Sequence, residues 1–303
     1  TPYDTLAAAV AASSAGQTIY VFKGDGTSTG YNAGVTLKNT QKLLGQGVNL
    51  VIDSTTLVTG SAGDRPLLRN ATGTAVTLAT GNEVAGIQIQ NSLQGLGATT
   101  QGGTVSIHDM VFMNITNEDI DLLTQSGTVT IANSTISGVG SASILVDGGD
   151  AAITLNGVTL TNTGFPAVQI QNRTGGSLQF LTGTIVQTNA EAVQVTNSAG
   201  TYRFDNVTQT GTGTGINISS SAAANFTFNT LSVNNAGTNG SMNLTNAGLV
   251  SVAGTSSLTN TAGPAISASN TTFGTSGGGG SAVFNSVSSS NSPSTGISLS
   301  STS

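Results

Sequence analysis

The sequence predicts an all-β protein built as a single right-handed parallel β-helix, with about 24 residues and three strands per rung and a short N-terminal capping helix. Three observations predict this fold class. Apolar residues occur in pairs two residues apart, as in strands whose alternate side chains point to the same face. The pairs recur at a nearly fixed period, which is the signature of a solenoid. Gly, Asn and Ser separate the pairs, and these residues favour tight corners.

The recurring apolar residues form three columns, one for each strand of a rung. The first column comprises Val105/Ile107, Val129/Ile131, Ile153/Leu155, Leu178/Phe180, Tyr202/Phe204, Phe226/Phe228 and Val250/Val252. The second holds one residue per rung, namely Phe112, Ile136, Leu160, Ile185 and Val233. The third comprises Ile120/Leu122, Ile144/Val146, Val168/Ile170, Val193/Val195, Ile216/Ile218, Met242/Leu244 and Ile266/Ala268. Rungs stacked about 4.8 Å apart would bury all three columns inside one rod of about eleven rungs.

The two ends of the chain complete a single domain over residues 1–303. Residues 1–16 predict a capping helix in which Leu6 and Val10 lie one turn apart and face the core. Residues 17–303 form the rungs, beginning with a strand at 18–22, and no C-terminal cap is evident. Segments 91–103 and 270–280 are expected to be loops inserted between rungs, because they interrupt the period with Gly, Ser and Thr.

Asparagine recurs at one corner of the rung, two residues past the third strand. The positions are Asn172, Asn197, Asn246 and Asn270. Asn tolerates the left-handed backbone conformation, and stacked carboxamides can form hydrogen bonds from rung to rung. We expect a structural asparagine ladder at this corner.

Composition excludes several classes of function. The chain has 303 residues with no cysteine, which excludes a disulfide scaffold and thiolate metal sites. The net charge of −6 argues against nucleic acid as a partner, and no apolar run is long enough to span a membrane. Residues 206–303 carry no charged side chain. That distribution favours an exported protein, located outside the cell or on a bacterial surface.

Residues 4–47 carry a family resemblance. The capping helix, the strand IYVF, the turn GDGT and the segment TLKNTQKLLGQG resemble the start of the right-handed parallel β-helices of large bacterial surface proteins. These include autotransporter passengers and inverse-autotransporter adhesins. Residues 76–303 are similar, more loosely, to the pectate-lyase-like superfold. The resemblance implies a β-helix on a cell surface and raises a polysaccharide lyase or hydrolase as an alternative, since one superfold hosts many functions.

Acidic residues near position 120 are the candidate site. Asp119 and Asp121 flank Ile120, so both are expected to point outward about 7 Å apart, a separation that suits the carboxyl pair of an inverting glycosidase. We predict no cofactor for the chain, but Glu118, Asp119, Asp121 and Asp147 together could instead bind calcium. The third interpretation is a solvated acidic patch. Catalysis on acidic sugars would need basic residues, and this face offers only Arg173 and, farther along, Arg203.

Two further features allow a structural interpretation. Arg203 and Asp205 flank Phe204 and predict an exposed ion pair. Outward positions near the second strand are rich in hydroxyl groups, as in Thr135/Ser137 and Thr159/Thr161. Such a grid occurs in ice-binding solenoids, but Thr is also simply a favourable outward residue in a sheet.

The predicted function is that of an extracellular scaffold or adhesin within a larger surface protein. It would bind a host, matrix or neighbouring-cell protein or glycan through its outer walls, without catalysis. The alternatives are the carbohydrate-active enzyme, with Asp119 and Asp121 as its acids, and a phage tail fibre or spike, which is also built from β-helices.

Overall fold

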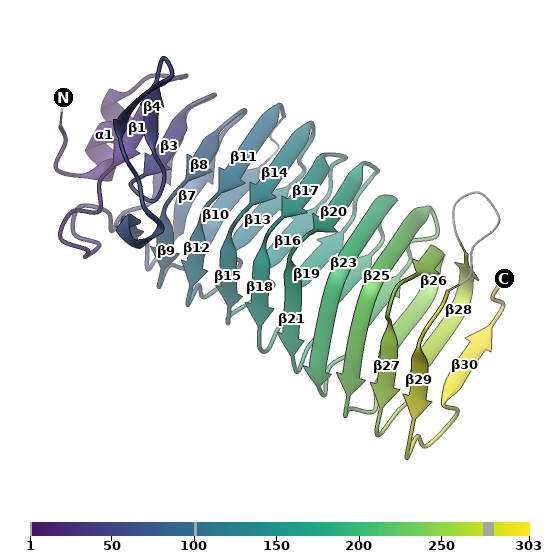
Figure 1. The fold of residues 1–303 in the computed structure, drawn as a ribbon. Helices are drawn as coiled ribbons and strands as arrows, with labels where there is room; N and C mark the ends of the chain where they lie inside the picture. The colour runs from purple at the N-terminus through teal and green to yellow at the C-terminus, as the bar shows by residue number, and fades with distance from the viewer. Residues whose placement is uncertain (1, 100–101, 275–281) are drawn as a thin grey trace.

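The computed structural model describes residues 2–99, 102–274 and 282–303, and it shows a parallel β-solenoid of the right-handed type with about 11 turns (Figure 1). Each turn takes about 24 residues and contributes to three walls, as the sequence predicts. The strands of neighbouring turns pair in parallel, and 28 of them form one continuous sheet. The rod is therefore held together by backbone hydrogen bonds that run along its axis.

The first wall contains strands that begin each predicted rung. Its members are β1 (Thr18–Val21), β3 (Lys42–Gly45), β8 (Glu83–Ala85), β11 (Thr104–His108), β14 (Thr128–Ala132), β17 (Ala152–Asn156), β20 (Ser177–Leu181), β23 (Gly200–Gly211) and β25 (Ala224–Asn235), followed by the second halves of β26 (Met242–Val252) and β28 (Ile266–Phe273).

The second wall follows around the first corner. Its members are β6 (Leu67–Leu68), β9 (Gln88–Gln90), β12 (Val111–Met113), β15 (Thr135–Gly138), β18 (Thr159–Asn162), β21 (Thr184–Thr188), the second halves of β23 and β25, β27 (Ser257–Asn260) and β29 (Ser286–Ser289).

The third wall closes the triangle. Its members are β2 (Val35–Thr36), β7 (Thr74–Leu78), β10 (Gln94–Thr99), β13 (Ile120–Leu123), β16 (Ile144–Asp147), β19 (Val168–Gln171), β22 (Val193–Thr196), β24 (Ile216–Ser219), the first halves of β26 and β28, and β30 (Ile297–Ser300).

The predicted apolar columns lie stacked inside the rod. Ile131 pairs with Leu155, and Leu155 pairs with Phe180, and all three side chains are fully buried. The second column differs at one place, because Leu231 continues the line of Ile185 through Val207, whereas Val233 pairs with Gln209. Leu231 and Val233 are both apolar and two residues apart, so the period alone cannot choose between them.

The ends of the chain match the prediction in part. Helix α1 (Leu6–Ala12) buries Leu6 and Val10 against the core, with the Thr5 side chain as its N-cap. At the other end Ile297 and Leu299 are about half exposed, at 50% and 54%. The turn that contains them covers the preceding one, and no described residue packs over it in turn.

Three segments differ from the expected loops and rungs. Residues 94–99 form β10 and residues 270–273 belong to β28, so the predicted loops 91–103 and 270–280 are partly wrong; residues 100–101 and 275–280 lie outside the described part of the chain. An antiparallel hairpin of β4 (Leu50–Ile52) and β5 (Thr55–Val58), followed by the 3-10 helix η1 (Ala62–Asp64), projects from the first turns. The sequence period did not predict this hairpin.

The left-handed asparagine corner is confirmed, and the carboxamide ladder is formed at one step, between Asn172 and Asn197. Asn172, Asn197, Asn246 and Asn270 all have left-handed backbones, with φ of 54°, 49°, 55° and 47°. The Asn197 amide donates to Asn172 Oδ1 at 3.0 Å, and the Asn172 amide donates to Asp147 Oδ1 at 2.9 Å. One hydroxyl follows Asn197: Ser198 Oγ accepts from the Arg173 N–H at 3.2 Å and donates to the Thr196 carbonyl at 2.9 Å. At this corner the Ser198 hydroxyl thus pairs with one backbone group of its own turn and one of the preceding turn.

Replacing Asn197 separates the two contributions of this ladder. We expect Asn197→Ala to lower the free energy of unfolding by about 1–2 kcal/mol, because alanine is strained in the left-handed conformation and cannot donate to Asn172. Asn197→Gly keeps the conformation and loses only the carboxamide, so its cost should be clearly smaller. Chemical denaturation of both variants measures the difference. Equal losses for the two variants would contradict a role of backbone conformation.

Candidate functional site

The acidic residues near position 120 lie at the corner between the second and third walls. Glu118 and Asp119 precede β13, and Asp121 is its second residue. The prediction that Asp119 and Asp121 both point outward is wrong for Asp119, whose side chain is fully buried. Strand β13 starts at Ile120, so the alternation of inward and outward side chains along the strand does not extend back to Asp119. The backbone of the corner instead directs the Asp119 carboxyl into the rod. The two acids therefore cannot act as a pair on one substrate.

The surroundings of Asp119 are small and polar. An added Cβ on Gly138 would lie 2.9 Å from Asp119 Oδ2 and 2.0 Å from Ser143 Oγ, so the carboxyl packs against the Gly138 backbone beside Ser143. Asn162 donates to Ser143 Oγ at 2.9 Å. Burial raises the pKa of Asp119 to about 8, with a further rise from the Glu118 charge and an opposing effect of Ser143. At neutral pH Asp119 is thus held as a neutral acid inside the rod.

Glu118 and Asp121 remain on the outside and share one donor. The Gln94 amide donates to Glu118 Oε2 at 3.2 Å and to Asp121 Oδ2 at 2.8 Å. The Gln94 carbonyl accepts from the Thr74 hydroxyl at 2.6 Å, which fixes the amide. Burial, followed by repulsion from Glu118, raises the pKa of Asp121 to about 6. This arrangement joins two carboxylates through a neutral amide on the third wall.

The four calcium candidates occupy three separate environments. Asp119 lies in the interior, Glu118 and Asp121 contact Gln94, and Asp147 accepts from Gln171 at 2.9 Å as well as from Asn172. Within the described ranges, no three His, Asp or Glu side chains gather into a group that could hold a metal ion. Calcium binding stays a prediction, and the predicted set of ligands does not converge.

Arg173, the nearest basic residue of that face, is also in the interior. Its side chain is 2% exposed, and Nη2 donates to the carbonyls of Ala151 at 2.6 Å and Gly175 at 3.0 Å. The Arg173 side chain thus stabilises the backbone of the corner that follows the third wall, and it cannot contact a polysaccharide on the surface. Arg203 forms the predicted exposed ion pair, with Nε 2.7 Å from Asp205 Oδ1.

A second cluster of charged side chains lies on the first wall. His108 Nε2 is 3.2 Å from Glu83 Oε1, and His108 Nδ1 is 2.7 Å from Asp109 Oδ2. Lys42 Nζ lies 2.8 Å from Glu83 Oε2. The hydrogen bond that His108 donates to Glu83 raises the pKa of His108, with Asp109 adding to the rise, and the same bond lowers the pKa of Glu83 to about 2. The sequence period does not reveal this cluster: the hairpin between β3 and β8 hides the pairing of Lys42 with Glu83, and Glu83 and His108, one turn apart, belong to no repeated column.

This cluster predicts that the stability of the first turns is greatest within a limited pH range. Because the folded pKa of His108 is raised, its stabilising contribution is complete below about pH 6.5 and is lost as the pH rises through the folded value. Because the pKa of Glu83 is lowered, its contribution is present above about pH 4.5 and is lost as the pH falls toward 2. We expect His108→Gln to be less stable than the wild type at pH 5.5 and to approach it at pH 9. Hydrogen exchange of the β8 and β11 amides measures the local stability of both proteins. An equal loss of stability in His108→Gln at both pH values would contradict the predicted role of His108.

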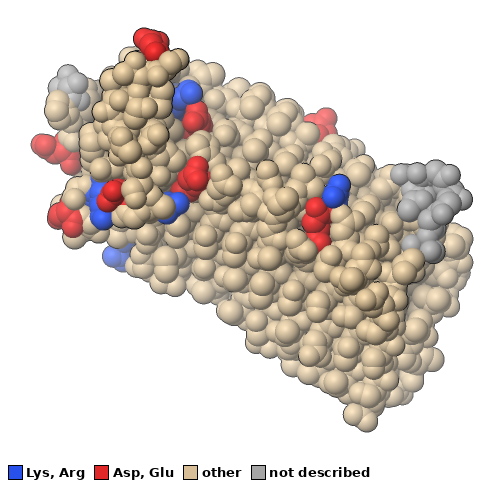
Figure 2. Space-filling view, in the orientation of Figure 1, with Lys and Arg blue, Asp and Glu red and all other residues tan. Residues whose placement is uncertain are grey.

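The walls beyond these clusters are almost free of charge. Figure 2 shows that charged side chains gather at the N-terminal end of the visible face, whereas its C-terminal half is nearly bare of them. On the second wall one outward column runs in register through Ser137, Thr161, Val186, Thr208, Ser232 and Ser257. The predicted hydroxyl grid is therefore a physical column, interrupted at Val186.

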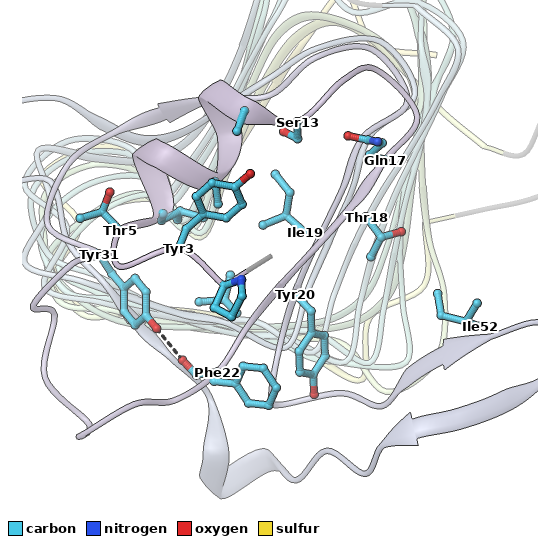
Figure 3. A pocket seen from close by; sticks show the side chains of 15 residues that line it. Tyr3, Thr5, Ser13, Gln17, Thr18, Ile19, Tyr20, Phe22, Tyr31 and Ile52 are labelled. Atoms are coloured by element: carbon cyan, nitrogen blue, oxygen red, sulfur yellow. Dashed lines mark hydrogen bonds between the residues drawn. The ribbon is translucent and has the colours of Figure 1, made fainter.

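A third feature is a pocket at the N-terminal end, between α1 and β1. It has a volume of about 880 Å³, and its lining includes the aromatic rings of Tyr3, Tyr20, Phe22 and Tyr31 (Figure 3). Three of the four tyrosines of the chain lie here, at positions that no repeated pattern in the sequence indicates.

No helix among the described residues is both long enough and apolar enough to cross a membrane. Comparison of the chain with protein-family models, with curated proteins and with solved structures found no match.

Proposed function

We propose that the chain is an extracellular scaffold or adhesin module that binds partners through its outer walls without catalysis. It would be displayed on a bacterial surface as part of a larger protein, and its partners would be host, matrix or neighbouring-cell proteins or glycans. The observation that carries this proposal is the second wall, where small neutral side chains repeat in register from Ser137 to Ser257.

The physical basis of the proposal is a rigid surface with repeated contacts. Parallel strands fix the spacing of the outward hydroxyl groups at about 4.8 Å along the axis. Backbone pairing holds these side chains in place, so a partner would bind without ordering a loop first. Because residues 206–303 carry no charge, we expect binding there to depend little on salt.

Binding of the purified chain to a panel of matrix proteins, cell-surface glycans and cells tests the proposal. The variant Thr161→Lys/Thr208→Lys/Ser232→Lys places three charges along the second wall and should weaken binding at least tenfold. The matched control Gln169→Lys/Gln194→Lys/Asn217→Lys adds the same charge to one outward column of the third wall, where these residues pair in register.

The control should bind like the wild type, and affinity should change less than about twofold between low and high salt. Two results would contradict the proposal. One is the absence of binding to every member of the panel. The other is turnover of a polysaccharide that Asp121→Asn abolishes, which would make the chain an enzyme.

A further inference from the structure

Strand β1 has one unpaired edge. Among the strands of the described ranges it pairs with β3 alone, in the register Thr18↔Lys42 to Val21↔Gly45. On that side the Lys42 N–H donates to the Gln17 carbonyl at 3.1 Å, and the Gln46 N–H donates to the Val21 carbonyl at 2.9 Å.

The backbone groups of successive residues in a strand point to opposite sides. The N–H and C=O groups of Thr18 and Tyr20 therefore face away from β3. Within the described ranges of the chain no residue forms a hydrogen bond to them. This edge thus presents two donors and two acceptors in a line.

The next carbonyl along the same edge already has a partner. The Tyr31 hydroxyl donates to the Phe22 carbonyl at 3.0 Å, as the dashed line in Figure 3 shows. A side chain thus completes the edge at its far end. The groups of Thr18 and Tyr20 lie beside the N-terminal pocket and have no such partner.

The pocket turns this edge into a groove. One side is α1, which contributes Leu6, Ala9 and Ala12, and the other is β1 itself (Figure 3). The Tyr20 and Phe22 rings meet edge to face, 5.2 Å apart, and the Tyr20 hydroxyl donates to the Val48 carbonyl at 3.0 Å. These contacts fix the aromatic side chains. None of the lining residues is Asp, Glu, Lys or Arg.

We propose that this groove binds an extended, uncharged peptide segment of another protein as an added strand on β1. The contact would repeat the rung-to-rung backbone pairing that builds the rest of the rod, with one set of alternate apolar side chains of the peptide entering the pocket between α1 and β1, beside the buried Ile19 and Val21. A sugar could stack on the rings, but it would not match the line of backbone groups at Thr18 and Tyr20. This site lies at the end of the rod and is independent of binding through the walls.

A peptide copied from the chain itself provides the probe. The uncharged peptide acetyl-GTVTIAN-amide reproduces residues 127–133 around β14, where Val129 and Ile131 point inward as Ile19 and Val21 do in β1. Fluorescence anisotropy of the labelled peptide measures its binding to the full chain. Thr18→Pro removes one free N–H without touching the bonds to β3, since proline is tolerated where the N–H faces away from the sheet. We expect it to weaken binding at least tenfold.

Two controls make the result specific. Thr18→Val keeps the N–H and removes only the hydroxyl, so it should bind like the wild type. With the wild-type protein, peptides N-methylated at one alternate set of amides should lose binding, and those methylated at the other set should keep it, because only one set faces the groove. This second measurement does not depend on the folding of any variant.

Four outcomes would overturn the proposal. The first is no binding of the peptide, and the second is equal binding to the wild type and Thr18→Pro with no effect of N-methylation. The third is loss of binding only in Leu299→Pro, which removes a free N–H from β30 at the opposite end of the rod. Binding of a neutral oligosaccharide in the groove, in place of the peptide, would likewise assign the pocket to carbohydrate.

Discussion

Replacing Phe204 by alanine is expected to lower the free energy of unfolding by about 3–5 kcal/mol. The ring is fully buried and stacks on Phe228 of the next turn, with ring centroids 5.5 Å apart and planes inclined by 14°. Its removal leaves a cavity in a column that neighbouring turns cannot close, because backbone pairing fixes their spacing. Chemical denaturation, followed by circular dichroism, measures the loss.

The matched control for Phe204 lies one residue away. Arg203→Ala removes an exposed ion pair with Asp205, which we expect to contribute less than about 1 kcal/mol. The double variant Phe204→Ala/Phe228→Ala should cost less than the sum of its single variants, because the two rings contact each other. A loss below about 1 kcal/mol for Phe204→Ala would contradict a packed interior at this turn.

Replacing Asp119 by asparagine is expected to stabilise the protein by on the order of 3 kcal/mol at pH 8 and by little at pH 4. Burial raises the pKa of the carboxyl from 3.8 to about 8 in the folded state. Between these values the unfolded chain has lost the proton that the folded chain retains, so the stability of the wild type falls as the pH rises. Above about pH 8 the folded carboxyl ionises too, and the loss stops growing.

Asp150→Asn provides the control for this effect. It removes an exposed carboxylate one turn farther along, and it should not reproduce the gain in stability that Asp119→Asn shows at pH 8. Denaturation at both pH values measures the two variants. If Asp119→Asn is no more stable than the wild type at pH 8, the carboxyl is ionised at low cost, and our account of its environment is wrong.

Comparison with the following turns shows that the fold does not need a carboxyl group at position 119. The corresponding residues of the following turns are Ser143, Ala167 and Ala192, whose carbonyls accept from the first N–H of β13, β16 and β19. The backbone carbonyl makes the hydrogen bond between turns at this corner, so a small side chain is sufficient there. The fold does not require the carboxyl of Asp119, and the structure shows no interaction that explains it.

The regular part of the rod could be predicted from the sequence, because its physical cause is periodic. Every turn must bury the same faces, so residues such as Ile131, Leu155 and Phe180 recur in register and reveal their strand. The asparagine corner was predictable for the same reason. The hairpin β4–β5 was not, because it projects from the rod and repeats nothing.

The site was harder to predict, because its residues lie where the period fails. Alternation along a strand places Asp121 correctly but does not hold at the corner that contains Asp119. Arg173 follows the left-handed Asn172 and turns inward for the same reason. The contact of His108 with Glu83 depends on the pairing of β11 with β8, on the side of the irregular first turns. The sequence period indicates which residues repeat from turn to turn. It does not indicate where a single polar residue points, because the local backbone of the corner determines that direction.

Distances between spin labels test the stacking of successive turns most directly. The chain has no cysteine, so labels can be placed without background at Ser106 and, in turn, at Thr154, Gln179 or Thr227, which lie on one outward column of the first wall. Our account predicts that the distance from the label at Ser106 grows linearly, by about 4.8 Å for each turn that separates the two sites. A distance that fails to grow, or that alternates as in two facing sheets, would contradict the solenoid and every proposal built on it.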